Sequence, residues 1–127
     1  MAFTLDIPTI LEYGWTGKRW NIVGDRKIYE NLEWIDVSAK PTEQAMLVVE
    51  LAAAKARRIV ASKQEAMNRI YEDYPIWKQV NCSNGFYDES TTSAIKAGIQ
   101  AVRTAQAQAE VAINTLETAA AALAFTW

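Results

Sequence analysis

Apolar residues recur at alternating steps of four and three over much of this chain, which is the spacing of one face of an α-helix. Between Thr42 and Tyr74 the sequence contains no glycine or proline, and the spacing is interrupted only at Lys63. Thr42 is a good N-cap residue, and Glu43 places a negative charge in the first turn, where the helix dipole favours it. The pattern predicts a long helix over residues 42–74.

A second apolar row flanks this helical face at steps of seven: Met46, Ala53, Val60, Met67 and Tyr74. Pro75 then ends or kinks the helix, because proline lacks the amide hydrogen and disfavours helical geometry in the preceding residue. The residues that follow predict a short amphipathic helix over 76–82. Within it Trp77, like Trp34 earlier in the chain, is expected to lie in the core.

The most regular pattern comes after the loop "CSNGFYDESTTS", in which Asp88 and Ser90 are capping candidates. From there the four-three alternation is unbroken and predicts one helix over residues 90–125. A sustained period of 3.5 residues is typical of a coiled-coil seam. One interpretation packs this helix on the first one as an antiparallel hairpin, and the other adds a partner chain.

Low charge favours the partner chain, because residues 104–127 contain no basic residue and only two acidic ones. A solvated helix face normally carries more charge than that. Gln106 in the seam would then set register or oligomeric state, and a tryptophan such as Trp127 would suit a pocket on the partner. The predicted partner-binding residues, here called the seam, are Ile99, Val102, Gln106, Ala109, Ile113, Leu116, Leu123, Phe125 and Trp127.

Strand signals concentrate in the first 40 residues. The runs "RWNIV" and "KIYENLEWIDV" are rich in aromatic and β-branched residues, and Gly24-Asp25 is a hairpin-type break between them. Neither face of the second run is cleanly apolar, so a bulge or small turn is expected near Asn31. The expected fold class is α+β. A small antiparallel β-module over residues 1–40 precedes a long-helix region over 41–127 that forms a helical hairpin or a coiled coil.

Charge gives no indication of nucleic acid or membrane as a partner. The 127 residues carry a formal net charge of −2, which produces no long-range attraction for anionic polymers or surfaces. A basic stretch does occur in the first long helix, but we interpret it as a solvated face with pairing between residues four apart. Its members are Lys55, Arg57, Arg58, Lys63 and Arg69.

Candidate chemistry is sparse. The chain has no histidine and one cysteine, which removes the commonest general base, the commonest metal ligand and a cysteine-rich zinc site. No phosphate-binding glycine motif is present. The pairs Glu72-Asp73 and Asp88-Glu89 suit caps or solvated helix ends, and Cys82 suits a small buried residue. We expect no enzyme, no metal and no cofactor. The single cysteine and the absence of a signal-peptide pattern predict a soluble protein of a reducing cytoplasm.

Two stretches resemble a phage tail-protein pattern. The first, "WNIVGDRKIYENLEWID…KPTEQAM", combines an aromatic strand, a Gly-Asp turn, a "YENLEW" run and a "KPT" helix start. The second, "IYEDYPIWKQVN" followed by "IKAGIQAVRTA", is similar to the later half of the same pattern. The resemblance covers residues 20–46 and 70–105 and departs from the pattern before Trp20 and after Ala105. The group comprises tail-fibre assembly chaperones and related tail accessory proteins.

The resemblance implies a non-enzymatic chaperone that binds a trimeric tail fibre, at its distal end, and assists folding or trimerisation in the host cytoplasm. In some phages such proteins remain on the virion. From the seam we expect other chains as partners, either copies of this chain in a homo-oligomer, a trimer being one option, or the fibre itself, and from the charge we expect neither nucleic acid nor membrane as a partner. The alternative is a permanent structural component or adaptor of the phage tail or baseplate, since both need only interfaces.

Overall fold

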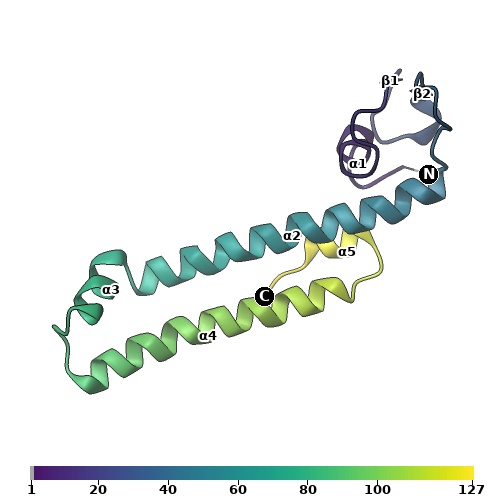
Figure 1. The fold of residues 1–127 in the computed structure, drawn as a ribbon. Coiled ribbons are helices and arrows are strands. Elements are labelled where there is room, and N and C mark those ends of the chain that lie inside the picture. The colour runs from purple at the N-terminus through teal and green to yellow at the C-terminus, as the bar shows by residue number, and fades with distance from the viewer. Residues whose placement is uncertain (1) are drawn as a thin grey trace. The chain divides into compact units, whose positions relative to one another are not determined.

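The computed structural model describes residues 2–127 and confirms an α+β fold that is 65% helical (Figure 1). A two-stranded antiparallel sheet lies near the N-terminus, and long helices follow. A short 3₁₀ turn, Tyr29–Asn31, precedes the second strand. The elements in chain order are α1 (Ile7–Gly14), β1 (Trp20–Ile22), β2 (Leu32–Trp34), α2 (Glu43–Asp73), α3 (Ile76–Ser83), α4 (Glu89–Asn114) and α5 (Ala119–Ala124).

The chain forms two compact units that share helix α2. Unit 1 comprises the residues up to Arg58 together with Leu116–Phe125, and unit 2 comprises Ile59–Thr115 with Thr126–Trp127. The division therefore falls inside α2 and does not coincide with residue 40, where the sequence pattern changes from strand to helix.

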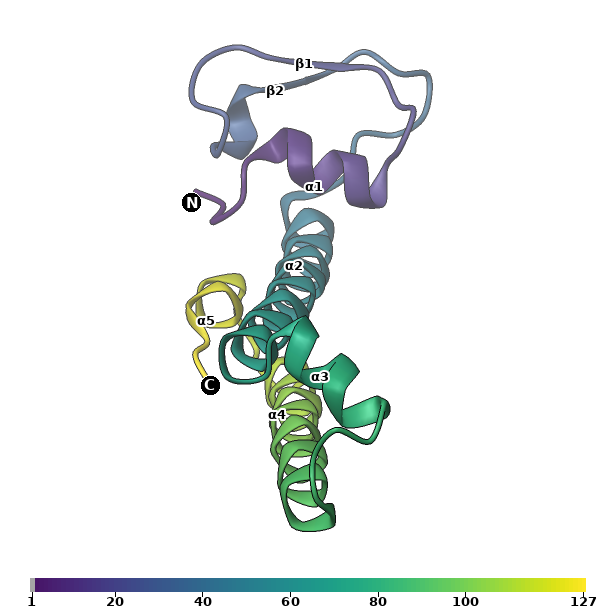
Figure 2. The ribbon, with the colours of Figure 1, turned by 90° about the vertical axis from the view of Figure 1, so that its left-hand side faces the viewer.

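The sheet of unit 1 is shorter than its strand signals, because each of its two strands has three residues. Trp20 pairs with Trp34 and Ile22 with Leu32 in an antiparallel register. The turn expected near Asn31 is present as the 3₁₀ turn before β2. Gly24 follows β1 with φ of +108°, a backbone conformation that glycine adopts without a steric penalty. Figure 2 shows the two strands beside α1.

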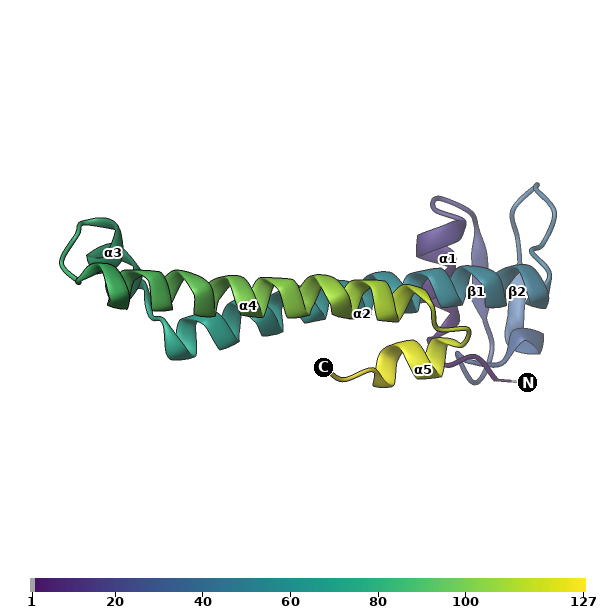
Figure 3. The ribbon, with the colours of Figure 1, turned by 90° about the horizontal axis from the view of Figure 1, so that it is seen from below.

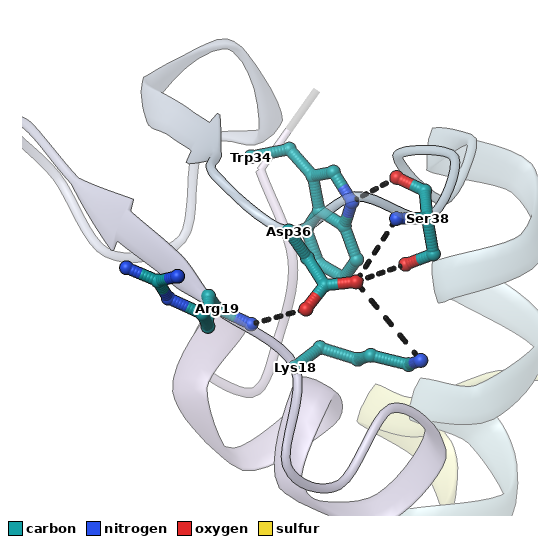
Figure 4. A network of polar contacts seen from close by, with 5 residues as sticks. All are labelled: Lys18, Arg19, Trp34, Asp36 and Ser38. Carbon is teal, nitrogen blue, oxygen red and sulfur yellow. Dashed lines mark hydrogen bonds and ion pairs between the residues drawn. The ribbon is translucent and has the colours of Figure 1, made fainter.

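A polar network fixes the loop after β2 (Figure 4). The Asp36 carboxylate accepts hydrogen bonds from the Ser38 hydroxyl at 2.6 Å and from the Ser38 and Arg19 amides at 3.0 and 3.3 Å. The Trp34 indole donates to the Ser38 carbonyl at 2.7 Å, and Lys18 lies 4.0 Å from Asp36. The Ser38 hydroxyl, and then its amide, hold the pKa of Asp36 below its ordinary value. The network ties the end of β2 to the residues before β1.

Helix α1 corrects the expectation that the first 40 residues form only a β-module. Asp6 is its N-cap and Pro8 lies in its first turn, where proline is tolerated. Ile7, Ile10 and Leu11 share one face at spacings of three and four, and none of them is exposed to solvent. The signal was present in the sequence, but the strand-like composition around it concealed an eight-residue helix.

The core of unit 1 combines α1 and the sheet with the first half of α2 and with α5. Met46 and Ala54 of α2 are completely buried, as is Ala122 of α5. Glu50 of α2 is also buried, and its carboxylate accepts a hydrogen bond from the Leu5 amide at 2.8 Å. This bond connects the N-terminal segment to α2 across 45 residues of sequence.

The predicted continuous helix over residues 90–125 is wrong, because α4 ends at Asn114 and α5 begins at Ala119. At the end of α4 the Thr115 hydroxyl donates to the Ala112 carbonyl at 2.7 Å. Thr118 caps α5 by accepting from the Ala121 amide at 3.2 Å. Threonine competes in this way for backbone groups and favours helix ends. The break also allows α5 to contribute to the core of unit 1.

Unit 2 consists of the second half of α2, α3 and α4, with a loop between α3 and α4. Figures 1 and 3 show α4 running alongside the part of α2 nearest to α3. Gly98 lies in α4 where the ring of Tyr74 approaches, and a β-carbon at Gly98 would overlap that ring. A larger residue at position 98 would therefore require the Tyr74 ring to shift, whereas glycine accommodates the ring although it weakens a helix interior.

Candidate protein-binding surface

The middle of the predicted seam packs inside unit 2. Ala109 and Ile113 are buried, and Ile99 and Val102 are half-buried. The Gln106 amide donates to the Ser62 hydroxyl of α2 at 3.1 Å. The polar position of the seam thus has a hydrogen-bond partner within the same chain. This agrees with the hairpin interpretation for these residues, while their role in binding another chain stays a prediction.

The end of the seam divides between the two units. Leu116 and Leu123 are half-buried against the core of unit 1. Phe125, also half-buried, accepts a hydrogen bond through its carbonyl from the Arg58 guanidinium at 2.7 Å. The side chains of Leu116 and Leu123 are therefore partly covered by their own unit.

Trp127 rests against α2 in unit 2. The Arg69 guanidinium lies 3.7 Å from the centroid of the Trp127 ring and donates to its backbone oxygen at 2.6 Å. Within residues 2–127 the buried indole nitrogen has no hydrogen-bond partner, an arrangement that costs about 1–3 kcal/mol. The structure thus places Trp127 on its own chain, and its predicted use in a partner's pocket remains a prediction.

Helix α3 has its apolar side outward. Ile76, Trp77 and Val80 lie on one face and are 57%, 61% and 49% exposed, whereas Cys82 on the other side is buried. We call these three exposed residues the α3 surface. The expectation that Trp77 belongs to the core is wrong. Its spacing correctly predicted an amphipathic helix but did not specify which face the rest of unit 2 covers.

The flanking row of α2 changes character between the two units. Met46 and Ala53 are buried in unit 1, whereas Val60 and Met67, further along the same row, are 68% and 45% exposed in unit 2. Tyr71, one turn beyond Met67, is also exposed. An apolar stripe thus continues along α2 beyond the core that covers its first half.

Several of the charged candidates have structural partners. Asp88 caps α4 by accepting a hydrogen bond from the Thr91 amide at 2.7 Å. The hydrogen bond from the Thr91 side chain, and after it the one from the Thr91 amide, lower the pKa of the Asp88 carboxyl. In the basic stretch Arg58 and Arg69 bind backbone oxygens, and Lys63 lies 3.6 Å from Glu110. Engagement within the chain is what a structural role for these charges predicts.

Two further findings concern residues 2–127. Within that range no group of three or more histidine, cysteine, aspartate or glutamate side chains is arranged to hold a metal ion. Nor does any helix there combine the length and the hydropathy needed to cross a membrane. The strongest feature that remains is exposed apolar surface on α2 and α3.

No family model matches the chain, and neither the curated proteins nor the solved structures that were searched contain a match.

Proposed function

We propose that this protein is a non-enzymatic assembly chaperone that binds a phage tail-fibre polypeptide through the α3 surface. The observation that carries the proposal is the outward apolar face of α3. Full burial of a large apolar side chain contributes about 1.5–3 kcal/mol of favourable free energy. Three such side chains share one face of α3, a helix of eight residues. A clustered, exposed apolar face is typical of a protein-binding site.

The nature of the partner comes from the resemblance of residues 20–46 and 70–105 to tail-fibre assembly chaperones. The second of these stretches contains the whole of α3. In the proposal the chaperone covers apolar surface on an incompletely assembled fibre, and the fibre chains displace it or retain it once they have trimerised. A homo-oligomeric chaperone, with up to three copies on a trimeric fibre, is part of the same proposal.

The test is co-expression of the tagged chain with the tail-fibre proteins of the genome that encodes it, followed by affinity purification. Wild-type chain should retain a fibre protein, and Trp77→Ser should retain several-fold less. Val80→Ser has a matched control in Val111→Ser, because both valines are exposed positions on helices of unit 2. Loss of binding by the first and not by the second is expected. Equal retention by all variants would contradict the proposal.

The rival role, a permanent component of the tail, predicts a different outcome. A structural component is present stoichiometrically in purified particles, and its deletion leaves fibre folding unchanged. A chaperone deletion should instead leave the fibre protein insoluble or untrimerised. Quantitative mass spectrometry of particles, combined with fibre solubility in a deletion strain, separates the two.

A further inference from the structure

A pocket of about 240 Å³ lies within unit 2, between α2, α3 and α4. Its apolar wall includes Met67, Ile70 and Tyr71 from α2. An engineered apolar cavity of about 150 Å³ is large enough to hold benzene. The pocket can therefore receive an aromatic or a branched aliphatic side chain.

The amides that line the pocket are held in place by the chain itself. Gln79 donates through its side-chain nitrogen to the Tyr74 carbonyl at 2.7 Å, and Gln106 donates to Ser62 at 3.1 Å. Each amide nitrogen uses one of its two N–H groups in this bond, which fixes the position of the side chain in the wall of the pocket.

Two cations, Lys63 and Arg103, line the same pocket, and none of the acidic residues in the described part of the chain does. Lys63 lies 3.6 Å from Glu110, but its side chain is 60% exposed, and exposed ion pairs contribute only about 0–1 kcal/mol. For Arg103 the structure records no ion pair or hydrogen bond within residues 2–127. By sequence unit 2 has five basic and six acidic residues, so this positive site lies on a slightly negative unit.

We propose that this cationic pocket binds an apolar side chain of a partner polypeptide that has an aspartate or glutamate next to it in sequence. The apolar side chain lies against Met67, Ile70 and Tyr71, and the neighbouring carboxylate pairs with Arg103. Arginine is suited to this role because its guanidinium can donate two parallel hydrogen bonds to one carboxylate. The proposal rests on the proposed function, since it takes the ligand to be a polypeptide.

The test uses an amidated peptide in which a phenylalanine is flanked by two aspartates. Two matched peptides replace the aspartates by lysines or the phenylalanine by alanine. Binding is followed by NMR of chain labelled with ¹³C at the methionine methyl groups. Met67 lines the pocket, whereas Met46 is completely buried in unit 1. The aspartate peptide should shift the Met67 signal and leave the Met46 signal unchanged, and each control peptide should bind at least tenfold more weakly.

Arg103→Glu should weaken binding of the aspartate peptide at least tenfold, which corresponds to about 1.4 kcal/mol. Lys96→Glu makes the same charge change at an exposed position of α4 outside the pocket and should change affinity less than about twofold. Arg103→Gln provides a second variant with less risk to folding. Equal affinities of the aspartate and lysine peptides, or an unchanged affinity in both Arg103 variants, would overturn the proposal.

Failure of the pocket and failure of the proposed function give different results. If the peptide moves Met67 but no fibre protein is retained, the pocket proposal stands and the chaperone role falls. If a fibre protein is retained equally by wild type and by Arg103→Glu, and the peptide leaves the Met67 signal unchanged, the chaperone role stands and the pocket proposal falls.

Discussion

Asp6 shows how a single carboxylate sets the beginning of a helix. Its Oδ1 accepts hydrogen bonds from the Thr9 hydroxyl at 2.6 Å and from the Thr9 amide at 2.9 Å. The hydrogen bond from the Thr9 hydroxyl, and after it the one from the Thr9 amide, hold the pKa of the Asp6 carboxyl below its ordinary value of 3.8. The folded chain therefore binds fewer protons at this site than the unfolded chain does near and below pH 4. The stability that this difference contributes is present above pH 4 and is lost as the pH falls toward the folded pKa.

Asp6→Asn should reduce the loss of stability in acid, because asparagine caps a helix about as well as aspartate but does not titrate. The free energy of unfolding, measured in urea at pH 6 and pH 3, should fall more in wild type than in Asp6→Asn. Glu12→Gln removes an exposed carboxylate from the same helix and controls for the change in net charge. A difference between the two pH values that is identical in wild type and Asp6→Asn would contradict this account of the cap.

The sequence identified a residue's role correctly where the residue interacts with neighbours close to it in the chain. Thr42 and Asp88 were identified as caps, and each accepts a hydrogen bond from an amide three residues later. Trp77 was misplaced because its exposure depends on what packs against α3, which no local pattern records. The pocket around Arg103 was missed for the same reason, since its lining comes from three helices.

At the scale of elements, α4 and α5 divide what is one continuous pattern in the sequence. The heptad spacing continues unchanged through residues 114–118, yet α4 ends there. The turns that follow form α5, which packs into the core of unit 1. The periodicity predicted which apolar residues share one helical face. It did not predict the break, because threonine capping and packing against distant segments decided where the helix ends.

The buried face of α4 can be tested with two substitutions two residues apart. Ile113 is fully buried and Val111 is 67% exposed. Ile113→Ala should lower the free energy of unfolding by about 2–5 kcal/mol, the range for large-to-small changes in a core. Val111→Ala should change it by no more than about 0.5 kcal/mol, as surface substitutions usually do.

Urea unfolding followed by circular dichroism would measure both values. Comparable small effects at the two positions would mean that Ile113 faces away from the interior. The seam would then be available to another chain, as the partner-chain interpretation requires.

At the scale of the whole molecule, the sequence predicted the α+β class and the long second helix, but not the division into units. The boundary lies between Arg58 and Ile59 within α2, where the helical pattern continues without any change that would mark a boundary. The change at residue 40 marks a transition in secondary structure only. Units are defined by contacts among distant segments, such as α5 with the first half of α2, and those contacts have no local signature.

The central claim is that α3 is the surface that meets the fibre, and hydroxyl-radical footprinting of the purified complex tests it most directly. Trp77 is 61% exposed in the free chain, and Tyr13 in unit 1 is 56% exposed. On binding a fibre protein, the oxidation rate of Trp77 should fall several-fold relative to the free chain, while that of Tyr13 stays the same. An unchanged oxidation rate of Trp77 in a complex that contains fibre protein would contradict the claim.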